Sequence, residues 1–98
     1  MYSMDDLLHL VNSDGADELR LQVGTPPIVV LGGEHHQVEG PAITMENVEE
    51  LWHSLADTRQ RRELRALGMV QFIYRFRAGT NFVVCARLEN ENVRINIH

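Results

Sequence analysis

The sequence contains no lysine, and all nine of its basic residues are arginine. A P-loop nucleotide site needs a lysine that reaches the β- and γ-phosphates, and Schiff-base chemistry needs a lysine amine. The pattern G-x-x-x-x-G-K-[ST] is therefore missing from these residues. Self-sufficient ATP hydrolysis of the P-loop type and amine-based catalysis are both excluded.

The sequence also has little cysteine, few basic residues and no long apolar run. The single Cys85 cannot form an internal disulfide, which is typical of the reducing cytoplasm. Nine basic against fourteen acidic residues give a formal charge of -5, which disfavours general nucleic-acid binding. No apolar run approaches the roughly 20 residues that cross a bilayer, and Asp5 and Asp6 stand where a secretory leader has basic residues. We expect a cytoplasmic protein without membrane insertion.

The apolar residues predict one α+β domain that spans residues 1–98. With 44% apolar residues, a chain of this length holds a core without disulfides or a structural metal. The first part alternates between turn signals and short periodic segments. It predicts a helix over Met4 to Val11 with Ser3 as its N-cap, and strands over Asp17 to Val23, Ile28 to Leu31 and Glu34 to Val38.

Two helices are expected next, meeting near Asp57. Thr44 caps the first, in which a stripe at spacings of three and four faces the core, formed by Met45, Val48, Leu51, Trp52 and Leu55. Asp57 and Gln60 form a capping box at the start of the second, and Gly68 ends it.

From Met69 onward the apolar period changes to two, which predicts a three-strand antiparallel meander. Apolar side chains share one face on each strand: Val70, Phe72, Tyr74 and Phe76, then Phe82, Val84, Ala86 and Leu88, then Val93, Ile95 and Ile97. A loop over Ala78-Gly79-Thr80 would pair Phe76 with Phe82, and a two-residue turn at Asn90-Glu91 would pair Leu88 with Val93.

One segment resembles the opening of the type IV pilus retraction and type II secretion ATPases, which reads A-S-D-L-H-L-x-x-G-x-P-P-x-x-R-x-x-G. The segment is Ala16-Asp17-Glu18-Leu19-Arg20-Leu21-Gln22-Val23-Gly24-Thr25-Pro26-Pro27 with its continuation to Gly33. The run Asp57-Thr58-Arg59-Gln60-Arg61-Arg62-Glu63-Leu64 is similar to the D-x-x-Q-R-x-x-F/L step of that family. The resemblance implies a PAS-like N-terminal domain, an antiparallel sheet with helices packed on one face. In the full ATPases this domain packs against a neighbouring subunit of a hexameric ring.

The sequence departs from the family pattern at positions that bear charge. Arg20 stands where the family usually has His, and Thr80-Asn81-Phe82-Val83 stands where it often has A-R-F-R. Asn81 and Val83 cannot supply the charged fork that stabilises a transferring phosphoryl group, so we expect no arginine finger on this strand.

Candidate metal and nucleophilic sites do not emerge. His35 and His36 are adjacent and would point to opposite faces of a strand, and no spacing such as HExxH joins them to His9, His53 or His98. Cys85 lies on the polar face of the meander, where we interpret it as a structural thiol opposite Ile73 and Asn96. We predict no catalytic residue, no metal and no cofactor.

The second face of the meander carries the candidate partner-binding residues. Strand parity places four of the nine arginines there, namely Arg75, Arg77, Arg87 and Arg94. Arg87 would stand opposite Arg94, a like-charge pair that costs stability unless an acid such as Glu89 intervenes. Two interpretations remain open: a solvated face, and a docking face for carboxylates of a protein partner, flanked by Ile73 and Val83.

The sequence therefore favours a non-enzymatic interaction or regulatory module of pilus or secretion ATPase machinery. Its partner would be such an ATPase or another copy of the chain. Two alternatives stay open. One is a small PAS-like domain that senses a ligand between helix and sheet, and the other is an isolated N-terminal piece of a longer motility ATPase.

Overall fold

A computed structural model describes residues 2–98 and contains one six-stranded antiparallel sheet with three helices. The helices are α1 (Met4–Asp14), α2 (Met45–Leu55) and α3 (Thr58–Leu67), and the strands are β1 (Glu18–Leu21), β2 (Ile28–Leu31), β3 (Glu34–Gln37), β4 (Met69–Arg77), β5 (Thr80–Glu89) and β6 (Asn92–Ile97). The α+β class, the antiparallel sheet and the final meander are confirmed. None of these helices has the length and apolar composition needed to span a membrane.

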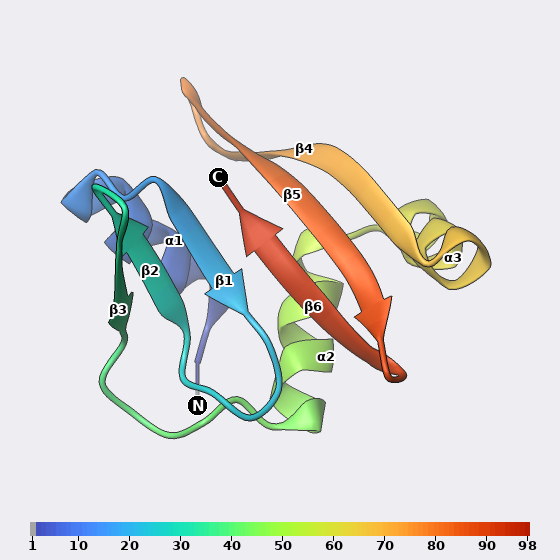
Figure 1. Cartoon of the computed structure of the whole chain (residues 1–98). Coiled ribbons are helices and arrows are strands. Elements are labelled where there is room, and N and C mark those ends of the chain that lie inside the picture. Colours follow the sequence, from blue (N-terminus) through green and yellow to red (C-terminus); the bar gives the residue numbers. More distant parts are fainter. Residues whose placement is uncertain (1) are drawn as a thin grey trace.

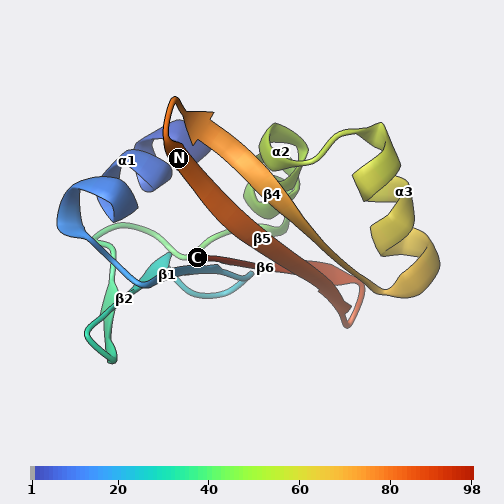
Figure 2. The ribbon, with the colours of Figure 1, turned by 90° about the horizontal axis from the view of Figure 1, so that it is seen from above.

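The sheet joins two meanders from opposite ends of the chain. Its strand order is β3-β2-β1-β6-β5-β4, so the first strand of the chain pairs with the last (Figure 1). All three helices lie on the same side of this sheet (Figure 2). We call the side that they cover the inner face and the other side the outer face. Because only one face is covered, β1, β5 and β6 alternate buried apolar residues with more exposed outward residues.

The core fills the layer between the inner face and the helices. Leu19 and Leu21 of β1 and Ile95 and Ile97 of β6 are fully buried there. Trp52 of α2 is 3% exposed, and its ring lies 6.0 Å from the ring of Phe72 on β4. Burial of this kind removes apolar surface from water and is the main term that stabilises the domain.

Local signals set the helix ends. Asp57 and Gln60 form the expected capping box, and Gly68 ends α3 in the left-handed conformation. The expected end of the first helix at Val11 is wrong: α1 continues to Asp14. Gly15 stops it, because its φ of 64° suits glycine and lets the cap N–H bond the Val11 carbonyl.

Met45 does not belong to the core stripe of α2. Its side chain is 61% exposed, whereas Val48, Leu51, Trp52 and Leu55 are buried as expected. Asn47 takes the inward position in the first turn, and its Nδ2 donates a hydrogen bond of 3.3 Å to the Tyr2 carbonyl. This bond compensates the burial of a polar side chain, which explains why an amide is tolerated there.

The register between β4 and β5 differs from the expected one by two residues. Tyr74, and not Phe76, lies directly opposite Phe82, and Gln71, and not Ile73, lies opposite Cys85. The hairpin closes through the tighter loop Ala78-Gly79, and the spare residue forms a bulge between Arg75 and Arg77. A shift by two residues keeps side chains on the same face, so the parity of β4 up to Arg75 is as predicted.

We predict that Trp52→Ala lowers the free energy of unfolding by about 3 to 5 kcal/mol, because it removes the largest side chain between α2 and the sheet. Urea unfolding followed by circular dichroism measures this change. Met45→Ala is the matched control on the same helix and should change stability by less than about 0.5 kcal/mol, as exposed positions do. Equal losses in the two variants would contradict the packing described above.

Candidate functional site

The outer face carries a row of directly opposed residues that runs across four strands. Arg20 of β1 lies opposite Asn96 of β6, Asn96 opposite Cys85 of β5, and Cys85 opposite Gln71 of β4. These side chains point outward because their strand neighbours fill the core. No helix within residues 2–98 covers this face, so a partner can approach its side chains.

A shallow hollow of about 240 Å³ lies on β5 and β6 beside this row. We call it the arginine groove, and its lining residues are Cys85, Arg87, Glu89, Arg94 and Asn96. Arg87 lies directly opposite Arg94 in the ladder, as the sequence predicted. The turn Asn90-Glu91 that fixes this register has positive φ at both residues, which matches the right-handed twist of a two-residue hairpin.

The charges of the arginine groove are only partly balanced. Glu89 Oε1 lies 3.5 Å from Arg94 Nη1, so one carboxylate offsets part of the charge of Arg94. Among the described residues no acidic side chain forms an ion pair with Arg87. The side-chain Oδ1 of Asn96 is buried and accepts no hydrogen bond within residues 2–98. The groove therefore combines an exposed, unpaired guanidinium, which can bind a carboxylate from outside, with a buried amide oxygen that has no donor.

Arg20 is on the same face but is already paired. Its Nε donates to Glu18 Oε2 at 2.9 Å and its Nη2 to Glu18 Oε1 at 3.4 Å. The hydrogen bond and the charge of Glu18 raise the pKa of Arg20 above its ordinary value. This bidentate pair engages the guanidinium within the chain, so Arg20 is less available to a partner than Arg87.

The four predicted arginines do not form one cluster. Arg75 lies opposite Asn81 near the β4–β5 hairpin, six residues along β4 from the position opposite Arg87, which is roughly 20 Å. Arg77 leaves the outer face altogether, because the bulge before it reverses the alternation and pairs it with Thr80. Its Nη2 lies 2.5 Å from His9 Nε2 of α1, and its guanidinium covers the Phe76 ring at 5.2 Å.

The structure thus corrects the predicted arginine face to two separate places. Arg87 and Arg94 share the arginine groove, whereas Arg75 and Arg77 lie at the far hairpin, with Arg77 turned toward α1. Parity alone could not find the bulge. The available signal was Gly79, because a glycine in the left-handed conformation after a short turn is typical of hairpins that contain a bulge.

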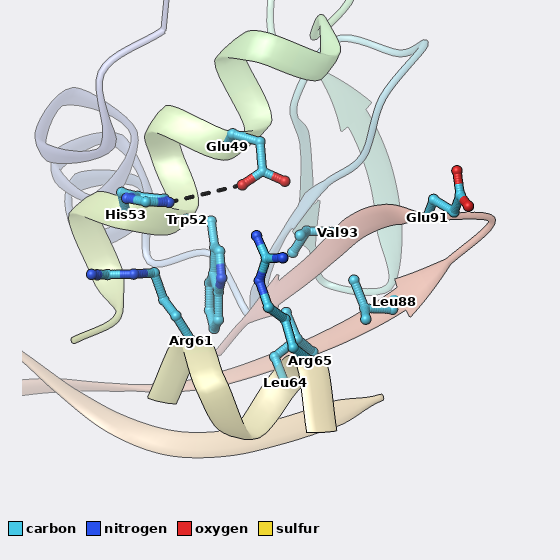
Figure 3. Close-up of a pocket in the computed structure, with 9 residues that line it drawn as sticks. All are labelled: Glu49, Trp52, His53, Arg61, Leu64, Arg65, Leu88, Glu91 and Val93. Carbon is cyan, nitrogen blue, oxygen red and sulfur yellow. Dashed lines mark ion pairs between the residues drawn. The ribbon is translucent and has the colours of Figure 1, made fainter. Parts of the chain in front are cut away.

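A second hollow of about 310 Å³ lies between α2, α3 and the β5–β6 hairpin (Figure 3). Its floor is Trp52, Leu64 and Val93, which are nearly fully buried, and its rim mixes acidic and basic groups. Arg61 on this rim is a structural residue, because its Nη1 donates to the Ala56 carbonyl at 2.6 Å where α2 meets α3. The hollow is an opening between packed elements and is not a deep chamber.

Histidines and the cysteine form no centre within the described chain. Each of three histidines pairs with an acid on its own element: His9 with Asp5 at 3.4 Å, His36 with Glu34 at 3.4 Å, and His53 with Glu49 at 4.0 Å (the last drawn in Figure 3). Across residues 2–98 no three His, Cys, Asp or Glu side chains gather as a metal ion requires. Cys85 is half-buried beside Asn96.

Comparison with known proteins identifies the fold. No protein-family model matches the chain, and no curated protein matches it. The crystal structure of the pilus retraction motor PilT with bound ADP is similar over 100% of this chain, with 21% identity and a TM-score of 0.89. The ATPase DotB of Legionella pneumophila matches 97% of the chain with 19% identity and a TM-score of 0.80, and DotB of Yersinia pseudotuberculosis matches 99% with 12% identity and a TM-score of 0.66.

The three matches cover this chain but only a part of each motor. The chain spans 29% of the PilT structure, 27% of the Legionella DotB structure and 31% of the Yersinia one. This likeness shows that the 98 residues have the fold of the N-terminal region of pilus retraction and secretion ATPases, as the sequence motifs implied. The catalytic region of those ATPases lies outside the match.

Isothermal titration of the chain with Mg-ATP should show no binding tighter than about 1 mM and no hydrolysis, because these residues contain neither a P-loop nor a lysine. A P-loop ATPase titrated in the same buffer provides the positive control. Micromolar affinity for Mg-ATP would contradict this expectation.

Proposed function

We propose that the chain is a non-enzymatic protein-interaction module of pilus retraction or secretion ATPase machinery. It works in the cytoplasm and docks an acidic surface of the ATPase assembly through the arginine groove. The proposal combines the fold of the N-terminal region of these ATPases with the chemistry of the open outer face. It needs no cofactor, metal or nucleic acid.

The observation that carries the proposal is the directly opposed pair Arg87 and Arg94. Like charges opposite one another destabilise a sheet, by a few tenths of a kcal/mol or more. Glu89 reaches only Arg94, so Arg87 keeps an unpaired guanidinium on an otherwise acidic chain. A partner carboxylate placed between the two arginines would remove the repulsion and gain charge-assisted hydrogen bonds.

The surroundings of the pair suit a protein partner. Met69 lies directly opposite Arg87 and is 48% exposed, and Ile73 and Val83 face each other farther along the same outer face. Apolar contacts next to arginines are typical of interface cores, where arginine is enriched and other charged residues are depleted. Arg75 lies at the far end of the same face and would contact the rim of such a partner.

The ligand-sensing alternative receives less support. The layer between helices and sheet, where a PAS-like domain would hold a ligand, is filled by buried apolar side chains such as Val48, Leu51 and Ile95. Specific small-molecule sites need space lined by a few convergent polar groups. In a longer ATPase that contained these residues, the same groove would face an acidic patch of the neighbouring subunit.

We predict that Arg87→Ser combined with Arg94→Ser weakens binding to the purified pilus or secretion ATPase of the same genome at least several-fold and flattens its salt dependence. Stability should stay within about 1 kcal/mol or rise, because the repulsion between the arginines is removed. Biolayer interferometry at low and high salt measures the binding, and urea unfolding measures the stability.

The matched control is Arg59→Ser with Arg62→Ser, which removes the same charge from two exposed positions of α3. Binding should persist in this control at low salt. If the double variant of the groove binds as tightly as the control, the groove is a solvated surface and the proposal fails.

A further inference from the structure

The sheet ends in two edges that differ in length and chemistry. One edge is β3, which has four residues, all of them exposed and polar: Glu34, His35, His36 and Gln37. The other edge is β4, which has nine residues. Short, charged edges resist pairing with other chains, whereas long ones present a template of free backbone groups. Only the edge at β4 has the length to accept a further strand.

The hydrogen bonds of β5 reveal which backbone groups of β4 are free. Val83 exchanges both of its backbone hydrogen bonds with His98, at 2.6 and 2.9 Å, so its N–H and C=O point toward β6. The N–H and C=O groups of successive residues point to opposite edges of a strand, so those of the even-numbered residues of β5 point toward β4. The bond of 3.0 Å from the Leu88 N–H to the Gly68 carbonyl agrees. Hence Gln71, Ile73 and Arg75 direct their N–H and C=O groups away from the sheet.

The side chains of this edge carry few of the features that block pairing. From Met69 to Arg75 there is no proline and no acidic residue, and the bulge that disturbs the strand comes only after Arg75. Ile73 is 67% exposed at the middle of the strand. On the inner face Phe72 and Tyr74 are only half-buried, because no strand lies beyond them to complete their packing.

We propose that a second copy of the chain pairs with this edge, antiparallel, about a two-fold axis at Ile73. Ile73 is the midpoint of β4, so the symmetric register places Ile73 opposite its counterpart and Gln71 opposite Arg75 of the second copy. All of these residues have outward backbone groups, so each pair exchanges both N–H···O bonds. On the inner face the same register sets Phe72 beside Tyr74 of the second copy, which covers the half-buried rings.

The chemistry of β4 favours its own copy as the occupant. Self-pairing brings no like charges into opposition, because Arg75 meets Gln71 and the two Arg75 side chains lie at opposite ends of the paired stretch. The interface is isologous, so it closes at two copies, and the short charged β3 edges do not extend it. The arginine groove lies on β5 and β6 and stays open, so this inference stands apart from the proposed function.

Sedimentation equilibrium of the chain from about 10 µM to about 1 mM tests the pairing. We expect a species of twice the 11.2 kDa chain mass. Ile73→Pro should weaken the dimer at least about tenfold, because it removes an N–H that points outward and leaves the ladder with β5 intact. The matched control is His35→Pro on the other edge strand, β3. In the β2–β3 ladder the Val38 N–H donates to the Pro27 carbonyl at 2.8 Å, so by alternation the N–H of His35 points away from the sheet, as that of Ile73 does.

A pair of variants tests the register without altering the backbone. Gln71→Glu should tighten the dimer several-fold by facing Arg75 of the second copy, and high salt should remove the gain. Gln71→Arg should loosen it, because the same contact becomes repulsive. Thermal melts show whether each variant is folded. If Ile73→Pro does not fold, the two Gln71 variants test the dimer by themselves. A chain that stays monomeric throughout, or a dimer indifferent to the Gln71 charge, overturns the inference.

Discussion

The apolar layer between the inner face of the sheet and its three helices is the constraint on which the other features of the molecule depend. Leu19, Leu21, Ile95 and Ile97 form its floor, and Trp52 anchors α2 above it. Because the helices occupy one face only, every second residue of β5 and β6 must point into solvent. The pairing of Arg87 with Arg94 and the outward position of the half-buried Asn96 and Cys85 follow from this one-sided burial.

Periodicity in the sequence predicted much of the fold because the burial is one-sided. The alternation in residues 69–97 gave the three strands of the final meander, and Thr44, Asp57 and Gly68 marked helix ends that the structure confirms. The predictions were wrong where backbone geometry sets the end of a helix or the register of a hairpin and the apolar pattern does not change. α1 continues for three residues beyond Val11 before Gly15 ends it, and the hairpin at Ala78-Gly79 contains a bulge that parity cannot detect.

That bulge also explains why the candidate site was only partly predicted. Parity placed Arg87, Arg94, Cys85 and Asn96 on one face correctly, since an uninterrupted ladder joins β5 and β6. It failed for Arg77, whose side chain turns to His9 after the reversal. The unsatisfied Oδ1 of Asn96 could not be foreseen, because hydrogen-bond satisfaction depends on where neighbouring side chains settle in three dimensions.

We propose that the outer face, and not the helices, meets a partner ATPase. Hydroxyl-radical footprinting of the chain with and without the purified ATPase tests this most directly, because two exposed methionines report on the two sides. Met69 lies opposite Arg87 on the outer face, and Met45 lies on α2. The account predicts that the ATPase slows the oxidation of Met69 several-fold and leaves that of Met45 unchanged. Protection of Met45 with Met69 unaffected would contradict it.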